Sequence, residues 1–401
     1  GKEGTKEKET LKIGAILPLT GDLSSFGEGM NNVLALANEE INSAGGVLGK
    51  NVQLVICDDG TSPSGAKACF DKLTDQGIKF IIGPTFSGGI VKGVCEGASG
   101  GDCPAVKNKK VLLVSPSATS PLITELKDDG YIWRTPPSDA LQGEVLADYI
   151  YGLGVTKVGV IYRNDAYGSK LAEVFQRNFT KKVQVQVPMA SYPEDATGGF
   201  SQQIQSIYNS FIPDGLVIIS FVDDGINLLK ELEGFIGQKG YPKPKLFGTD
   251  GIKDTTVSEI EFAKGMSGTA PKPPVDDPDY KAFSDKYKSK FGKSPEVFYE
   301  HSYDAFYIIA LGIEAVGEYN PEKVKNILIN LTNSGEKIKP PAAGGNWKEI
   351  VSKVKSGADV DYKGVSGDVY FDQNGDVKGG LYEIWQIFGS GDIKEIKTIK
   401  K

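Results

Sequence analysis

The chain has 401 residues, of which 39% are hydrophobic and 24% charged, and its formal net charge is -7. This length exceeds the usual size of one hydrophobic core, so two domains are expected, and the composition is that of a folded globular protein rather than a disordered one. Lysines are spread among acidic residues instead of forming one basic stripe, which argues against a nucleic-acid partner. No apolar run approaches the ~20 residues needed to span a bilayer.

The first ten residues, GKEGTKEKET, are polar and predict a flexible tether over 1–10. One interpretation is a frayed terminus or a cloning remnant. The other is a spacer that follows a removed N-terminal signal and holds a lipid-anchored domain away from a membrane. The second interpretation predicts a periplasmic or extracellular protein.

Two similar units open the two halves of the chain. Leu11–Gly21 reads LKIGAILPLTG, a buried-strand pattern that ends in a polar turn before a long helix beginning near Phe26. The second unit starts at Lys157, where KVGVIYRNDAYG precedes a helix over 169–179. Open α/β sheets bind small ligands where strand ends meet helix starts. Two such units predict two lobes that share one cleft.

Four cysteines, Cys57, Cys69, Cys95 and Cys103, lie in the first part of the chain, and four cysteines allow three pairings. The glycine-rich segment between Cys95 and Cys103 closes easily, and Cys57 ends a strand before the helix that holds Cys69, which favours the pairs 95–103 and 57–69. Buried free thiols are the alternative. The spacings and the remote His301 disfavour a metal site. An even count in one lobe favours an oxidising compartment.

Short runs rich in Val and Ile alternate with amphipathic segments along most of the chain. Further strands are predicted at 52–57, 79–84, 111–116, 157–162, 185–190, 215–220 and 244–250, and helices at 30–43, 64–76, 142–153, 201–210, 225–237 and 279–291. Strands covered on both faces show such continuous apolar runs. Alternating strands and helices predict an α/β fold of two doubly wound parallel sheets with right-handed crossovers.

The pattern changes after Asp250. Residues 295–333 predict two helices without a sheet of their own, and 367–387 predict a β-hairpin that turns at Asn374-Gly375 and closes against the second lobe. The predicted division places 11–133 and 262–365 in lobe 1, and 134–261 and 366–401 in lobe 2. Three hinge crossings, near 133, 260 and 365, would restrict the motion to clamshell closure.

Catalytic motifs are scarce. His301 is the single histidine, and neither a GxxxxGK[ST] phosphate loop nor a GxSxG elbow occurs. Gly27-x-Gly29 follows the first strand, but Asn32 stands where a dinucleotide fingerprint needs a third glycine. His301 is best explained as an ordinary packed residue. We therefore expect no enzyme activity, no cofactor and no catalytic or structural metal.

Small polar residues at strand ends are the candidate binding groups. GPTFSGG (83–89) and SPSATSP (115–121) offer Ser87, Ser117, Thr119 and backbone amides, which suit an anion such as a carboxylate. In the other lobe Asp250 and Tyr167 end or follow strands, and an acid there can pair with an ammonium group. Helix capping is the alternative role for these hydroxyls and for Asp250. With the two sets on opposite lobes, a zwitterion would hold the lobes closed.

Several longer strings together are highly specific: IGAILPLTGDLSSFGEGMNNVLALANEEINSAGGVLGK, DDGTSPSGAKACFDKL, FIIGPTFSGG, VSPSATSP, DAYGSKLAEVF, FGTDG, SYDAF and GVSGDVYFDQNGD. Over residues 11–390 they resemble the type I periplasmic binding fold, in particular the leucine/isoleucine/valine-binding receptors of ABC importers. This resemblance implies a non-catalytic receptor that closes over a small amino acid, of the branched-chain type or related, and delivers it to a membrane permease. We expect it to act as a monomer.

The resemblance also implies roles for single residues. Ser87, Ser117 and Thr119 would meet the ligand carboxylate, Asp250 and Tyr167 would meet or cover the amino group, and Phe26 would cap the pocket.

The chain departs from the family at three places. The family's usual glutamate is the shorter Asp250, and SFVDDG places Phe221 and Asp223 where pocket contacts are expected. Asp223 either favours a second cationic group on the ligand or faces solvent. Residues 336–365 form a longer insertion without an assigned role. The alternative function is a sensor domain of the same fold for an amide, a urea or an aromatic acid.

Overall fold

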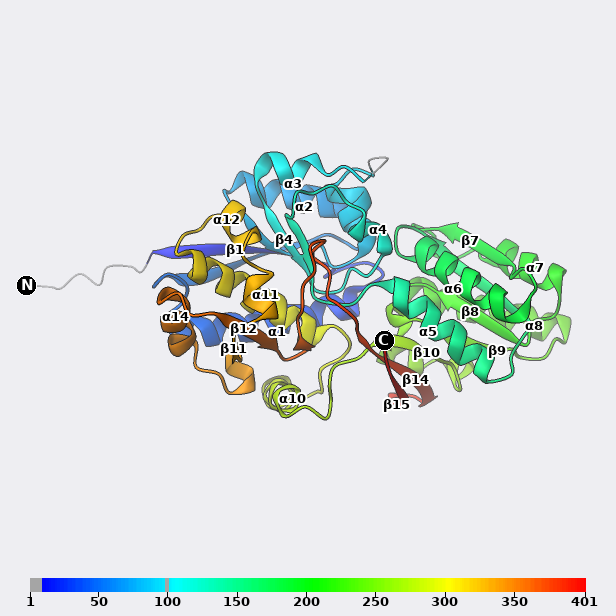
Figure 1. Ribbon diagram of the computed structural model, residues 1–401. Coiled ribbons are helices and arrows are strands. Elements are labelled where there is room, and N and C mark those ends of the chain that lie inside the picture. The colour runs from blue at the N-terminus through cyan, green and yellow to red at the C-terminus, as the bar shows by residue number, and fades with distance from the viewer. Residues whose placement is uncertain (1–8, 98–100) are drawn as a thin grey trace, which may run out of the picture.

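The computed structural model describes residues 9–97 and 101–401, and it consists of two α/β lobes joined side by side (Figure 1). Residues 1–8 of the expected tether and 98–100 of the glycine-rich segment lie outside the described residues. Within the described ranges, no helix combines the length and apolar character needed to cross a bilayer.

The first lobe is built on a five-stranded parallel sheet with the order β2-β1-β3-β4-β5. Its strands are β1 (Thr10–Leu17), β2 (Asn51–Asp58), β3 (Phe80–Ile82), β4 (Leu112–Ser115) and β5 (Ile132–Arg134). Its helices are α1 (Ser24–Ser43), α2 (Pro63–Asp75), η1 (Gly89–Val94), α3 (Pro104–Lys109), α4 (Pro121–Thr124), α10 (Pro278–Phe291), α11 (Tyr299–Val316), α12 (Pro321–Lys325) and α13 (Asn330–Asn333). β3 and β4 are buried throughout, as strands covered on both faces must be.

The second lobe is built on a seven-stranded sheet with the order β15-β14-β10-β9-β8-β6-β7. Its strands are β6 (Val158–Asn164), β7 (Met189–Pro193), β8 (Gly215–Ile219), β9 (Lys245–Gly248), β10 (Ser267–Pro271), β14 (Leu381–Gly389) and β15 (Asp392–Lys400). Its helices are α5 (Asp139–Gly152), α6 (Gly168–Val183), α7 (Ser201–Ser210), α8 (Val222–Lys239), η2 (Asp250–Ile252), α9 (Thr255–Ser258) and η3 (Glu261–Ala263). β14 runs antiparallel to β10 and β15, and the other pairs are parallel. The predicted fold class is confirmed.

The chain passes between the lobes three times, but two crossings lie later than expected. The first follows β5, close to the predicted position. β10 was expected in lobe 1, yet it pairs with β9 and β14, so the second crossing follows Pro271. The sequence SGTAP lacks the Val and Ile that mark a strand, and Gly268 packs against the backbone of Gly248, where a side chain would not fit.

Residues 366–378 stay beside the first lobe, and the third crossing lies just before β14. The hairpin expected over 367–387 is therefore wrong. Asn374-Gly375 does form a tight turn, with a single bridge between Phe371 and Val377, and the backbone N–H of Arg134 donates to the Gly375 carbonyl at 3.0 Å. The extended hairpin is instead formed by β14 and β15.

The insertion over 336–365 covers the first lobe. It contains β11 (Glu336–Ile338), η4 (Pro341–Ala343), α14 (Trp347–Lys355) and β12 (Val360–Gly364), and β12 also pairs with β13 (Gly367–Asp368). Trp347 Nε1 donates to the Gly46 carbonyl at 3.0 Å, and Tyr362 donates to Asp304 of α11 at 2.8 Å. The insertion thus encloses α11, whose residues are almost all buried.

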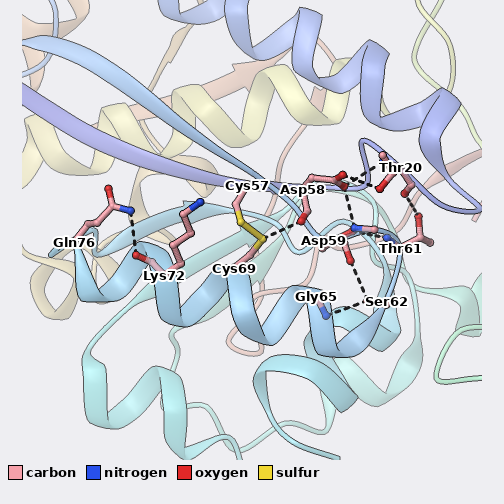
Figure 2. The surroundings of a disulfide bond; sticks show 11 residues. Thr20, Cys57, Asp58, Asp59, Thr61, Ser62, Gly65, Cys69, Lys72 and Gln76 are labelled. Carbon is pink, nitrogen blue, oxygen red and sulfur yellow. Dashed lines mark hydrogen bonds between the residues drawn. A yellow bond between two sulfur atoms is a disulfide. The ribbon is translucent and has the colours of Figure 1, made fainter.

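The two disulfides join the favoured pairs, Cys57 with Cys69 and Cys95 with Cys103. Figure 2 shows the first bridge between the end of β2 and α2, next to the hydrogen bonds that join Asp58, the last residue of β2, to Thr20 in the loop after β1. This bridge lies within the first lobe, and Asp58 beside it holds the loop that connects β1 to α1.

Candidate functional site

A cavity lies between the lobes, where strand ends face helix starts. Its wall consists of Pro18, Leu23, Phe26, Met30, Thr85, Phe86, Ser87, Ser117, Thr119, Tyr167, Phe221, Asp250, Gly251 and Phe298. All predicted site residues except Asp223 lie in this wall. Lysine, arginine and histidine are absent from it, as far as the described residues show.

The first lobe contributes a wall of hydroxyl groups on two neighbouring strand ends. Ser87 Oγ accepts the backbone N–H of Ser120 at 3.1 Å, and Ser117 Oγ donates to the Thr85 carbonyl at 2.6 Å. These bonds tie the loop after β3 to the loop after β4. Ser120 is the residue that caps α4, so the capping role considered for Ser117 and Thr119 is wrong.

Thr119 connects this wall to the second lobe. Its hydroxyl donates to Asp139 Oδ2 at 2.7 Å, and its carbonyl accepts the backbone N–H of Asp139 at 2.8 Å. Asp139 is the first residue of α5, directly after the first crossing. A strand end of one lobe is thus attached to a helix start of the other.

The second lobe contributes a buried carboxylate. Asp250 Oδ1 accepts Gln142 Nε2 at 2.5 Å and the Tyr167 hydroxyl at 2.8 Å. Burial raises the pKa of Asp250, although both hydrogen bonds oppose this shift. Asp254 caps the following helix α9, so Asp250 is not needed as its cap.

Two acids therefore share the interior beside the cavity. Burial, reinforced by the charge of Asp250, raises the pKa of Asp139 well above its ordinary value. Burial and the same charge also raise the pKa of Tyr167, which stays a neutral donor. A ligand cation at Asp250 would relieve this unfavourable concentration of negative charge.

Aromatic rings close the apolar part of the cavity. Tyr167 stacks on Phe221 with ring centroids 5.4 Å apart, and Phe86 of the first lobe meets Phe221 edge-on at 6.3 Å. Phe26 lies in the first turn of α1. Phe298 precedes α11 with a φ of 70°, a left-handed conformation that is unusual for a bulky residue. Such strain at a cavity wall is typical of functional positions.

Asp223 does not line the cavity; it is exposed in the first turn of α8. Its neighbour Asp224 points inward instead, where it accepts Arg163 Nη1 at 2.8 Å and the Tyr192 hydroxyl at 2.6 Å. The Arg163 guanidinium also lies 3.8 Å from the centre of the Phe221 ring. Arg163 thus pairs with the buried carboxylate of Asp224 and packs against the ring of Phe221, a residue of the cavity wall.

Hydrogen bonds at the cavity mouth connect the lobes. The backbone N–H of Val222 donates to the Asp22 carbonyl at 3.2 Å, Asp22 Oδ2 lies 3.3 Å from Arg163 Nη1, and Lys92 pairs with Glu194. Burial raises the pKa of Asp22 to about 6, with a further contribution from the charge of Asp224, while the charge and hydrogen bond of Arg163 oppose the shift.

The loop that carries Asp22 is held by the segment after β2 (Figure 2). Thr20 donates its backbone N–H to Asp58 Oδ1 at 3.1 Å and its hydroxyl to Oδ2 at 2.7 Å. Burial opposes ionisation of Asp58, but these bonds and one from Gly60 hold its pKa below the usual value. Thr61 further accepts the backbone N–H of Leu23, a wall residue, at 3.2 Å.

The single histidine takes no part in this site. His301 is buried in α11, outside the cavity wall, and burial lowers its pKa to about 3. Neither His, Cys, Asp nor Glu side chains form a group suited to a metal ion within 9–97 and 101–401.

Sequence comparison places this two-lobed chain in a known family. A family model described as periplasmic binding protein matches residues 10–369. The chain belongs to this family. A relative from Pseudomonas aeruginosa, a leucine-, isoleucine-, valine-, threonine- and alanine-binding protein, is 28% identical over 334 residues, covering 80% of this chain and 82% of the relative.

Crystal structures of family members share the fold. The leucine-binding protein LivK of Thermotoga maritima has a TM-score of 0.78 and 24% identity, covering 97% of this chain and 98% of its own. The isoleucine complex of LivJ from Streptococcus pneumoniae has a TM-score of 0.76 and 20% identity, covering 98% and 100%. A benzoate complex of an R. palustris solute-binding protein has a TM-score of 0.76 and 16% identity, covering 97% and 96%.

Sequence reasoning missed part of this binding protein's wall: Pro18, Leu23, Met30, Thr85, Phe86, Gly251 and Phe298. Thr85 and Phe86 lie inside the GPTFSGG string, so their place at a strand end was a usable signal. Leu23, Met30 and Phe298 carry no such signal, because apolar residues beside helix starts look the same whether they face a core or a cavity.

Proposed function

We propose that the protein is an extracytoplasmic solute-binding receptor that closes over a small amino acid, of the branched-chain type or related, and delivers it to the permease of an ABC importer. The observation that carries this proposal is the distribution of polar groups on the two walls of the cavity between the lobes. Hydroxyl groups and backbone amides form one wall, and the buried carboxylate of Asp250 faces them from the other lobe. The names of the amino-acid-binding relatives support the same ligand class.

In this proposal each wall binds one end of the ligand. Ser87, Ser117 and Thr119 bind the carboxylate, and Asp250 binds the ammonium group. Tyr167, Phe221 and Phe26 cover the apolar side chain. Because the two walls belong to different lobes, the bound zwitterion stabilises the closed form.

The proposed location and mode of action rest on other features. The two disulfides and the family favour an oxidising compartment, the periplasm or the cell exterior, with a lipid anchor as one role for the tether. In this proposal the receptor acts as a monomer and without catalysis, and its only histidine is a buried neutral residue outside the cavity wall.

Substitution of Asp250 tests the proposal. Asp250→Ala removes a buried charge-assisted contact worth about 1.5 to 3 kcal/mol, so affinity for the amino acid should fall at least about tenfold. Isothermal titration calorimetry with a panel of amino acids measures this effect. Asp223→Ala, which removes an acid outside the cavity, is the control and should bind as the wild type does. Wild-type protein that binds no amino acid, or an unaffected Asp250→Ala variant, contradicts the proposal.

The alternative ligand is an aromatic acid, an amide or a urea, which a sensor domain of this fold would report to a signalling partner. Two observations favour an aromatic acid: the rings of Phe86 and Phe221 in the wall, and the raised pKa of Asp250, whose neutral form can face a ligand without an ammonium group. Benzoate and simple amides in the same titration panel separate the two ligand classes, because only the amino-acid class depends on ionised Asp250.

A further inference from the structure

The first turn of α5 lies behind the cavity and contacts both of its walls. Asp139 and Gln142 are three residues apart on this helix, so they project from the same face. Their exposed fractions are 1% and 0%, and neither residue lines the cavity. α5 begins directly after the first crossing, at the place where the two lobes are joined.

Asp139 holds the wall of the first lobe. It receives the Thr119 hydroxyl at 2.7 Å and donates its backbone N–H to the Thr119 carbonyl at 2.8 Å. The carbonyls on either side are held as well, since Arg134 Nη1 donates to Ala118 at 3.3 Å and to Ser120 at 2.7 Å. Three consecutive carbonyls of the loop after β4 are therefore bonded to groups outside the cavity wall.

Gln142 holds the wall of the second lobe. Its Nε2 donates to Asp250 Oδ1 at 2.5 Å, beside the bond from Tyr167 at 2.8 Å. Two donors on one oxygen fix the rotation of the carboxylate plane. The direction of Asp250 toward the cavity thus depends on a residue outside the cavity wall.

We propose that Asp139 and Gln142 are positioning residues, through which one turn of α5 aligns the Thr119 hydroxyl and the Asp250 carboxylate on the two opposing walls. This inference rests on the proposed function in one respect only, namely that the cavity is the ligand site. Because both contacts come from one turn of α5, a shift of this turn changes the position of one binding group on each wall.

The bond between Asp139 and Thr119 also decides whether the Thr119 hydroxyl can donate a hydrogen bond to the ligand or only accept one. A threonine hydroxyl has one proton. If Asp139 is ionised, that proton is used in the bond to Asp139, and only lone pairs face the cavity. If Asp139 is a neutral acid, Asp139 donates to Thr119, and the threonine proton is free for a ligand carboxylate.

The surroundings of Asp139 favour its neutral form. Burial and the charge of Asp250 raise its pKa, the bond with Thr119 and the charge of Arg134 oppose this, and Tyr167 and Tyr382 are the other titratable groups nearby. A neutral Asp139 makes Thr119 a donor, which is the form that suits a carboxylate ligand.

Substitutions in α5 separate positioning from a merely structural role. Asp139→Asn keeps a donor to Thr119 and should retain the affinity for a carboxylate ligand within about threefold, whereas Asp139→Ala should lose about tenfold. Gln142→Met keeps the shape but not the donor and should also lose about tenfold. Glu144→Gln, on the solvent side of the same helix, is the matched control. Thermal unfolding identifies any variant that fails to fold.

Crystal structures of ligand-free Asp139→Asn and Gln142→Met provide a readout that needs no ligand. We expect Thr119 unchanged in Asp139→Asn and the Asp250 carboxylate rotated in Gln142→Met. An unrotated Asp250, or equal affinity losses in Asp139→Asn and Asp139→Ala, overturns the inference. Wild-type protein that binds no amino acid contradicts the proposed function instead, and the crystal structures still decide the positioning role.

Discussion

Single residues in the cavity wall could be predicted where a strand end dictates their position. Ser87, Ser117 and Thr119 follow β3 and β4, and parallel strands bring their carboxyl ends to one edge of the sheet. Asp223 shows where such reasoning ends. Adjacent helix residues point about 100° apart, and the buried Arg163, distant in sequence, contacts Asp224 rather than Asp223. The sequence pattern DDG does not reveal which acid turns inward.

Arg163 itself yields a prediction at this scale. Its guanidinium bonds Asp165 at 2.6 Å and Asp224 at 2.8 Å, and all three side chains are buried. Arg163→Met leaves two buried carboxylates without their cationic partner, which should lower the free energy of unfolding by about 3 to 5 kcal/mol. Urea unfolding measures this loss. The control Lys170→Met breaks a surface pair with Glu173 and should change stability by less than about 1 kcal/mol. An Arg163→Met variant as stable as this control contradicts the prediction.

At the scale of elements, regular parallel strands could be predicted and irregular ones could not. Runs such as FII and LLVS are apolar throughout because helices cover both faces of the sheet. β10 has small residues instead, because it packs closely against β9, and the Asn374-Gly375 turn is held by β5 rather than by a partner strand. In both cases contacts from distant parts of the chain decide the local structure.

The disulfide between β2 and α2 gives a prediction for an element pair. It closes a sequence separation of 12 residues, for which the loop entropy corresponds to about 2 to 4 kcal/mol. Cys57→Ser combined with Cys69→Ser should reduce the free energy of unfolding by this amount. Asp58, next to Cys57, holds Thr20, so ligand affinity should fall as well. Equal stability of the double variant and the wild type in urea would show that the bridge is dispensable.

At the scale of the whole molecule, the number of lobes and of crossings could be predicted, because both follow from the order of strands and helices. The exact crossing points could not be predicted. The lobe to which β10 and the segment 366–378 belong is decided by their packing contacts, which the hydrophobic pattern of the sequence does not reveal. The closed arrangement depends on side chains that meet only across the mouth, such as Asp22 and Arg163.

Closure should therefore depend on pH. Asp22 has a pKa of about 6 in the closed form, where it faces Arg163, Asp223 and Asp224, whereas a solvent-exposed Asp titrates near ~3.9. The closed form binds the proton more tightly, so acidification from pH 7 to 5 should favour closing by about tenfold. Small-angle X-ray scattering of ligand-free protein measures the closed fraction. Asp22→Asn should remove most of the dependence, and a wild type that opens on acidification would contradict this sign.

Both cystine bridges lie inside the first lobe, over separations of 12 and 8 residues, and neither spans the mouth. Oxidation therefore stiffens one half of the receptor without fixing its angle to the other half. Capture and release of cargo then rely on reversible contacts alone, and a change in the redox state of the surroundings alters the durability of the protein rather than its ability to open.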